Sequence, residues 1–229
     1  MKEIKKCVFC NIEDNFTEEQ ILYRGKYFYL VVPKGQIVEG YMIISPYKCD
    51  IHDGGIRSLS TAPKEVFKEM KAILEHIKKF YEFSYNIDSF SYYEQGRGAM
   101  QNEVDDLNAF PIHSHVCTLP SIYNFQEYMK NNYKEISLSK IEDIEKINTY
   151  YLLLSYVNNS KERICAYTGK TPKQIEELSH FRFKKVIASC LGCEDREQWR
   201  LCADIDQEAI GKVLTKYRSF INNNPNIKI

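Results

Sequence analysis

Polar and apolar residues alternate in a short segment, residues 110–120, that carries a proline near each end. Within it, His113, His115 and Cys117 are separated by Ser114 and Val116. Strict alternation bounded by prolines predicts a β-strand, whose successive side chains point to opposite faces of a sheet. The two histidines and the cysteine are therefore expected on one face. A lone histidine is most often a satisfied core residue, but burying three such groups unpaired is costly, so the pattern favours the floor of a functional site.

Two segments rich in Ile, Tyr, Phe, Leu and Met, residues 20–30 and 41–45, predict two further strands. Turn-forming residues at 33–36 separate them, so we expect these strands to form a hairpin. A fourth strand is predicted at residues 89–93.

Residues 60–84 repeat apolar side chains at spacings of three and four, which is the pattern of an amphipathic helix. Pro63 lies near its start, where a missing N–H is tolerated, and Ser60 or Thr61 can cap it. The apolar stripe consists of Val66, Phe67, Met70, Ile73, Leu74, Ile77, Phe80 and Tyr81. At least four strands with one long helix between the second and third predict an α+β fold.

The second half of the chain is predicted to be mainly helical, with a second hairpin made by residues 150–157 and 163–168. Thr171 and Pro172 begin a helix or helix pair that Gly192 ends, and Asp206 is expected to cap the final helix. The short helices before the hairpin are expected at residues 121–133 and 139–148, and the final one runs to about residue 220. No low-complexity linker interrupts the chain, so we expect a catalytic domain at 1–120 and an extension at 121–229 that packs on it.

Composition limits the classes of partner and the cellular compartment that we expect for this protein. Among 229 residues, 31 basic and 31 acidic side chains give a net charge of zero, which disfavours nucleic acid as a partner. The lysines near the N-terminus precede no apolar run, so neither a signal peptide nor a membrane span is expected. Eight cysteines without a secretion signal predict a reducing, cytoplasmic setting, in which they serve as thiols or metal ligands.

A Cys-x-x-Cys pair near the start of the chain, Cys7 and Cys10, suits two thiolates on one zinc ion. Cys49 and His113 lie in or just beyond elements expected in the same sheet, and three thiolates with one imidazole form a common closed zinc set. His52 is an alternative to Cys49. The competing interpretation is that these thiols are free.

The segment Glu94, Gln95, Gly96 and Arg97 follows a predicted strand, and another glycine comes directly after it. Glycines around an arginine can bring backbone amides and a guanidinium to a phosphate. The same residues are equally compatible with an ordinary turn.

Together these motifs resemble the histidine-triad (HIT) superfamily of nucleotide hydrolases and transferases. The chain opens with Cys7-x-x-Cys10, as bacterial members do. Residues 40–49 resemble the family's glycine, apolar strand, proline and zinc-site histidine, with Cys49 in the histidine's place. A long helix follows, and residues 113–120 resemble the signature of alternating histidines closed by a proline. The resemblance covers about residues 5–120.

The resemblance implies a HIT-like antiparallel sheet with a long crossing helix, and His115 in the place of the histidine that attacks the α-phosphorus of a nucleotide. His113 corresponds to a zinc ligand, and Cys117 to the third histidine of the triad. A structural zinc ion, a nucleotide or nucleotide-conjugate substrate and a covalent nucleotidyl-histidine are expected. Compact HIT proteins pair through the sheet and long helix, so a homodimer is expected unless the extension covers that surface and leaves a monomer.

The sequence departs from the family pattern at three places. Cys117 replaces the third histidine, and Pro33 stands where many members carry an aspartate that holds the ribose hydroxyls. The phosphate turn before the histidines is replaced by residues 108–112, so Asn108 joins residues 94–97 as a candidate for substrate binding. These departures motivate an alternative function: a catalytically weak nucleotide-binding sensor or an interaction module that retains the HIT fold.

Overall fold

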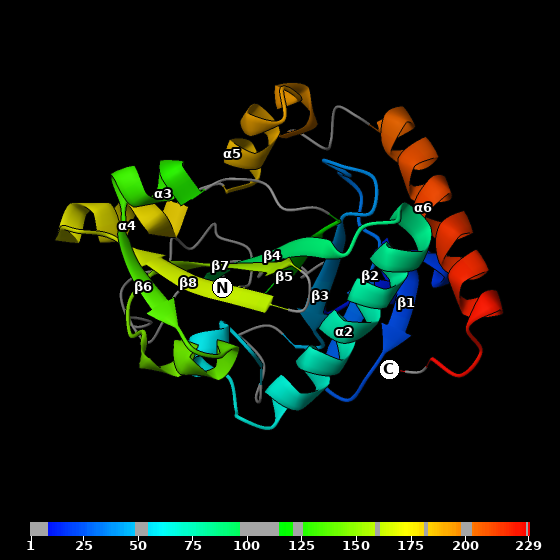
Figure 1. The fold of residues 1–229 in the computed structure, drawn as a ribbon, viewed down its shortest axis with the longest axis horizontal. Coiled ribbons are helices and arrows are strands. Elements are labelled where there is room, and N and C mark those ends of the chain that lie inside the picture. Colours follow the sequence, from blue (N-terminus) through cyan, green and yellow to red (C-terminus); the bar gives the residue numbers. More distant parts are fainter. Residues whose placement is uncertain are drawn as a thin grey trace, which may run out of the picture.

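The computed structural model describes residues 9–48, 55–96, 115–120, 126–158, 161–180, 183–197, 203–227 and 229. Within these residues one antiparallel sheet of eight strands runs through the molecule (Figure 1). Its strands are β1 (Ile21–Arg24), β2 (Phe28–Val31), β3 (Met42–Pro46), β4 (Ser89–Gly96), β5 (Val116–Leu119), β6 (Lys134–Leu138), β7 (Tyr151–Asn158) and β8 (Lys161–Thr168). Their order is β1-β2-β3-β5-β4-β7-β8-β6, and every neighbouring pair is antiparallel. The predicted α+β class is confirmed.

Helices cover both faces of this sheet. They are α1 (Ile12–Asn15), α2 (Val66–Tyr85), α3 (Gln126–Asn132), α4 (Pro172–His180), α5 (Phe183–Cys190) and α6 (Ala203–Asn223), with 3-10 turns η1 (Glu18–Gln20), η2 (Leu59–Thr61), η3 (Ile141–Lys146) and η4 (Glu194–Glu197). The two longest, α2 and α6, pack against each other, whereas α5 lies across the sheet from them (Figure 1). Among the described helices none has the length and apolarity that a membrane span requires.

The sheet separates two apolar layers. The layer that contains α2 and α6 includes Val116, Met70 and Val213, all fully buried. The opposite layer contains residues of α1, α3 and α5, with Cys117 and Leu119 of β5. Alternate residues of β5 therefore enter different layers, as the sequence pattern predicts.

The N-terminal and C-terminal halves share the sheet. β4 pairs with β7 along its whole length, from Ser89 opposite Asn158 to Gly96 opposite Tyr151. Two sets of contacts thus join the halves: backbone hydrogen bonds in the interior of the sheet, and the packing of α6 on α2. One sheet contains strands from both sides of residue 120, and the division into two domains at that residue stays a prediction.

Most predicted elements are present, with shifted bounds. The hairpin of β2 and β3, the helix α2 and the hairpin of β7 and β8 are confirmed. The helix α2 begins at Val66, later than expected, because Ser60 and Thr61 belong to η2 instead of capping it. Thr171 does cap α4, since its Oγ1 accepts a hydrogen bond from the backbone N–H of Gln174 at 3.3 Å.

Several elements differ from the prediction, and the short helix expected at residues 139–148 is only the 3-10 turn η3. Residues 20–30 form a hairpin of two strands, β1 and β2, because the Glu69 carboxylate accepts the backbone N–H groups of Lys26, Tyr27 and Phe28 and stabilises a turn. The edge strand β6 was not predicted, since it is only half-buried. Asp206 does not cap α6: it lies inside the helix and is 2% exposed.

Candidate functional site

The candidate site centres on β5, which lies between β3 and β4 in the interior of the sheet. Cys117 is opposite Ile43 of β3 on one side and opposite Tyr93 of β4 on the other. His115 immediately precedes the strand. A central strand with partners on both edges holds these residues in a fixed register.

His115 and Cys117 lie on the face of the sheet away from α2. Thr118, the next residue of β5, points to α2 and shares a hydrogen bond of 2.9 Å with the Tyr81 hydroxyl. The His115 ring packs edge-on against Phe9, with ring centroids 4.2 Å apart, and Phe9 belongs to the same apolar layer as Cys117. The structure therefore places His115 and Cys117 on the same face, as the alternation in the sequence predicts.

The Cys117 thiol is enclosed by two tyrosines. The hydroxyls of Tyr41 and Tyr93 lie 3.1 Å apart, and Tyr93 is opposite Cys117 in the sheet. Burial raises the pKa of Cys117, although the two tyrosine hydroxyls and the positive charge of Lys184 oppose the rise. Burial also holds the pKa of both phenols well above the ordinary value. The thiol is therefore neutral near pH 7, and as a weak donor it supports the site better than it serves as a nucleophile.

Most of the predicted zinc ligands lie outside the described residues, namely Cys7, Cys49 and His113, as does the alternative ligand His52. Cys10 is described and half-buried. It directly follows Phe9, so it lies close to the residue that packs on His115. Within the described ranges no cluster of three or more His, Cys, Asp and Glu side chains could hold a metal ion.

Glu94 lies on the other face of the sheet from His115. Its side chain is fully buried, and its carboxylate accepts hydrogen bonds from the backbone N–H of Leu59 at 2.8 Å and from the Tyr151 hydroxyl at 2.6 Å. The carboxylate thus fastens η2 and β7 to β4. The predicted contact of Glu94 with substrate receives no support from this geometry.

The two residues after Glu94 continue strand β4 instead of forming a turn. The Gln95 side chain donates to the carbonyl of Leu178 in α4 at 3.0 Å. Gly96 lies under the Tyr151 ring, where a Cβ atom would meet ring carbon at 2.0 Å, so the absence of a side chain is required for packing. Both residues have structural roles here, whereas the candidates Arg97 and Asn108 lie outside the described residues.

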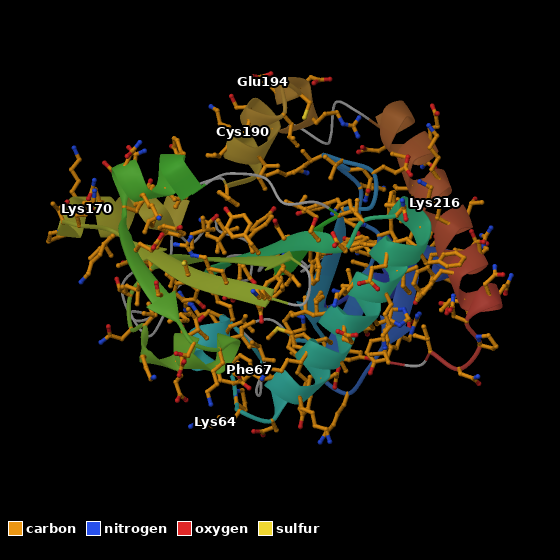
Figure 2. The ribbon with its side chains drawn as sticks, in the orientation of Figure 1. Lys64, Phe67, Lys170, Cys190, Glu194 and Lys216 are labelled. Carbon is orange, nitrogen blue, oxygen red and sulfur yellow. The ribbon has the colours of Figure 1, made fainter. Side chains whose placement is uncertain are left out.

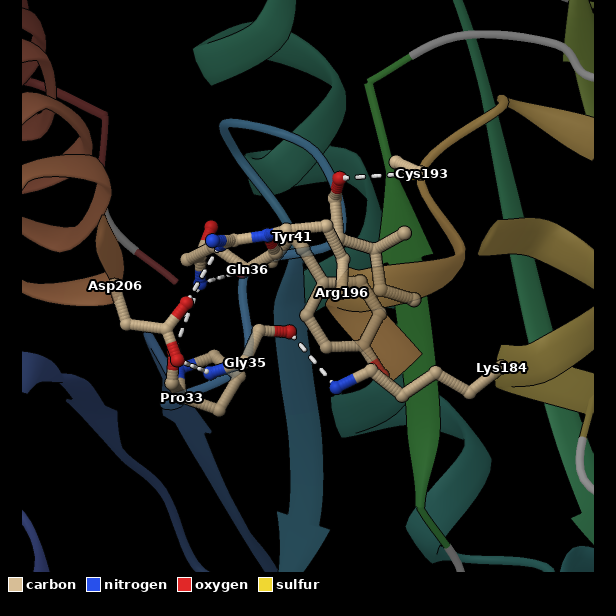
Figure 3. Close-up of polar contacts among 9 residues, drawn as sticks. Pro33, Gly35, Gln36, Tyr41, Lys184, Cys193, Arg196 and Asp206 are labelled. Atoms are coloured by element: carbon tan, nitrogen blue, oxygen red, sulfur yellow. Dashed lines mark hydrogen bonds and ion pairs between the residues drawn. The ribbon is translucent and has the colours of Figure 1, made fainter. Parts of the chain in front are cut away.

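The loop after β2, residues 33–37, is held by the C-terminal half, which no local pattern in the sequence predicts (Figure 3). Gly35 adopts a positive φ of 77°, and its N–H donates to Asp206 Oδ2 of α6 at 2.6 Å. The Gly35 carbonyl accepts a hydrogen bond of 2.9 Å from Lys184 Nζ of α5. Below we call residues 33–37 the 33–37 loop.

A buried ion pair completes this attachment. Arg196 of η4 donates through Nε and Nη2 to the Gln36 carbonyl, at 3.1 and 2.6 Å, and its Nη2 also lies 2.6 Å from Asp206 Oδ1. The Gln36 amide in turn donates to the carbonyls of Pro33 and Tyr41. Asp206 lies in register with the apolar stripe of α6, four residues before the buried Ile210, and that position is the sequence signal that could have revealed it.

This attachment matters for the candidate site because the 33–37 loop belongs to the same side of the sheet as His115. Ile37 and Tyr41 both pack in the layer that contains Cys117. Residues of α5, η4 and α6 therefore hold in place the 33–37 loop, which borders that layer.

Figure 2 shows the labelled Cys190 and Glu194 on the outer surface at the far end of α5, and both side chains are exposed.

A separate cavity of about 420 Å³ lies on the α2 face of the sheet. Phe90 and Tyr92 of β4 contribute to its lining, together with Lys71 and Lys78 of α2 and Glu162 of β8. Glu162 accepts a hydrogen bond from the Tyr92 hydroxyl. The sheet separates this cavity from His115, so it does not form part of the candidate site.

Comparison with known proteins adds no assignment: no family model matches the sequence, and no match is found among curated proteins.

Proposed function

We propose that this protein is a HIT-like nucleotide hydrolase or nucleotidyltransferase that acts at the α-phosphorus of a phosphoanhydride, phosphoramidate or ester, with His115 as nucleophile. The observation that carries the proposal is the position of His115 at the start of a central strand, on the same face as Cys117. The order of motifs that resembles the HIT superfamily provides the second support. The eight-stranded sheet and the long helix α2 are compatible with a HIT-like half that an extension completes.

In the proposed reaction, the unprotonated nitrogen of the neutral His115 imidazole attacks the α-phosphorus. A nitrogen–phosphorus bond forms, and the bond from phosphorus to the leaving oxygen or nitrogen breaks, with its electron pair leaving on that atom. Water or another acceptor then attacks the same phosphorus: an oxygen–phosphorus bond forms, and the nitrogen–phosphorus bond breaks with its electron pair returning to the imidazole. The proton that the acceptor loses passes to the departed leaving group or to solvent, and the imidazole is again neutral. Two displacements of lower barrier replace one difficult step.

The surroundings of His115 provide positioning. Packing against Phe9 restricts the ring, and the strand that follows holds the backbone between β3 and β4. The Nε2 atom is shielded from solvent. A substrate must therefore displace the groups that cover this atom and take their place, which keeps water away from the reacting atoms. Exclusion of water strengthens electrostatic interactions with phosphate.

Zinc is part of the proposal, with Cys7, Cys10, Cys49 and His113 as its ligands. Of these four residues the structure describes Cys10. Cys10 follows Phe9, whose ring contacts His115, and His115 is two residues after the proposed ligand His113 in sequence. A zinc ion held by these three thiolates and one imidazole would anchor the segment that carries Cys7 and Cys10 to the strand that carries the nucleophile.

The proposed assembly is a monomer. The edge of β4 is paired with β7 of the same chain, and α6 packs on α2. A second copy therefore cannot use these two surfaces in the way that compact HIT proteins do. Light scattering would give the mass of a monomer, whereas a stable dimer would contradict this part of the proposal.

The experiment that tests the function is covalent trapping. The wild-type protein and a His115→Asn variant are incubated with α-labelled nucleotides and dinucleoside polyphosphates, with and without phosphate. We expect acid-labile label on the wild type alone, and its loss on addition of phosphate would identify a phosphorylase. Tight nucleotide binding without label would refute the enzyme and favour a sensor.

A further inference from the structure

The helix α5 carries a lysine into the layer that contains Cys117. Phe183 and Ile187, one turn apart, are buried against the sheet, and the Phe183 ring packs edge-on against Tyr93 with centroids 4.9 Å apart. These contacts fix the helix. Lys184, which follows Phe183, is half-buried and reaches the 33–37 loop, whereas Lys185 points outward and is exposed.

The Lys184 ammonium lies beside the enclosure of the Cys117 thiol. Its Nζ atom lies 2.9 Å from the Gly35 carbonyl and 5.7 Å from the centroid of the Tyr41 ring, within the range of a cation–π contact (Figure 3). The Tyr41 hydroxyl lies 3.1 Å from that of Tyr93, the residue opposite Cys117 in the sheet, and the positive charge of Lys184 acts on the thiol. The C-terminal half thus brings positive charge to the face on which His115 lies.

The other groups of this enclosure are neutral. Burial keeps Cys117, Tyr41 and Tyr93 protonated, so none of them complements a negatively charged ligand by charge. A hydrogen bond from an ammonium to a phosphate oxygen is stronger than one to a neutral carbonyl such as that of Gly35. A phosphate group that enters this layer would therefore compete successfully for Lys184.

We propose that Lys184 binds the phosphate chain of the substrate and makes the site selective for nucleotides over uncharged nucleosides. This inference rests on the proposed function, because it assumes that a nucleotide enters the His115 face. The 33–37 loop, held by Arg196 and Asp206, places the Gly35 carbonyl so that Lys184 stays extended beside the Tyr41 ring before substrate arrives. Less ordering of the long side chain is then required on binding.

The test is a binding measurement on the full chain, made in a His115→Asn background so that turnover does not consume the ligand. Calorimetry compares ATP and GTP with the uncharged nucleosides adenosine and guanosine. Lys184→Met retains the aliphatic length over the Tyr41 ring but removes the charge, Lys184→Arg restores the charge, and Lys185→Met is the matched control on the same helix.

We expect Lys184→Met to weaken triphosphate binding by about tenfold, the scale of one charge-assisted hydrogen bond, with nucleoside binding unchanged. Lys184→Arg should recover most of the loss, and Lys185→Met should bind as the parent does. Equal weakening of nucleoside and triphosphate, or no change at Lys184, would overturn the inference while leaving covalent labelling of wild type intact. Absence of nucleotide binding in every protein, with no label on the wild type, would overturn the proposed function and this inference together.

Discussion

The ion pair between Arg196 and Asp206 gives the sharpest test of how the two halves are joined. Both side chains are almost fully buried, at 10% and 3% exposed, and their Nη2 and Oδ1 atoms are 2.6 Å apart. Removing one partner of a buried pair leaves an uncompensated charge and costs about 3–5 kcal/mol. We therefore expect Arg196→Met and Asp206→Leu each to lower the free energy of unfolding by this amount.

The double variant distinguishes an ion pair from two independent contacts. When both charges are removed, neither is left buried alone, although the Gln36 carbonyl and the Gly35 N–H still lose their partners. The cost of the double variant should then fall short of the sum of the single variants by about 2 kcal/mol, as expected for residues in direct contact.

The assay is urea unfolding at pH 7, followed by fluorescence and circular dichroism so that coincident transitions justify a two-state analysis. A matched control lies on the same helix: Lys212 and Glu208 are 2.7 Å apart but exposed, so water and salt screen their attraction and removing Lys212 should leave the urea midpoint unchanged. Single variants that each cost less than about 1 kcal/mol, or a double variant equal to their sum, would refute the reasoning.

Three further predictions concern stability. Burial, and to a lesser extent Lys79, lowers the pKa of His76 to about 4. Because the histidine of the unfolded chain binds a proton below about pH 6.5, whereas the folded protein does so only near pH 4, up to about 3 kcal/mol of the free energy of unfolding should be lost by pH 4. His76→Gln should flatten the pH dependence of urea unfolding over that range, and an unchanged slope would contradict this. Gly96→Ala should cost about 2 kcal/mol or more, because its Cβ would overlap the buried Tyr151 ring; a thermal midpoint equal to that of the wild type would show that the ring moves freely. Glu69→Ala removes the acceptor of three backbone N–H groups in the β1–β2 turn, so we expect a loss of about 1–3 kcal/mol and faster amide exchange there, whereas unchanged exchange would assign the turn to other contacts.

The elements that the sequence predicted well are those whose pattern depends on a single face. The stripe of α2 and the alternation in β5 follow directly from which side chains meet the core. Thr171 and Gln174 likewise identify the start of α4 from local chemistry alone. In each case the information lies within a few neighbouring residues.

The parts that the sequence did not predict depend on distant partners. Glu94 follows a strand and resembles a turn residue, but Leu59 and Tyr151 supply hydrogen-bond donors that keep it buried in β4. Asp206 resembles a helix cap until Arg196 and the 33–37 loop are placed beside it. A local pattern does not predict a buried polar group whose partner is distant in the sequence. For the same reason Lys184 could not be distinguished from an ordinary surface lysine.

The attachment of the 33–37 loop also has a consequence for synthesis of the protein. Gly35 and Asp206 are 171 residues apart in sequence. At about 5–20 residues per second, the ribosome adds that length in about 10–30 s, so the loop waits this long for the carboxylate that holds it. Contacts between such distant residues slow folding, because a long loop must close before they form. A nascent chain in which α6 has not yet been synthesised therefore carries His115 while the 33–37 loop beside it still lacks Asp206, and that side of the layer is completed only when residues 203–223 have emerged.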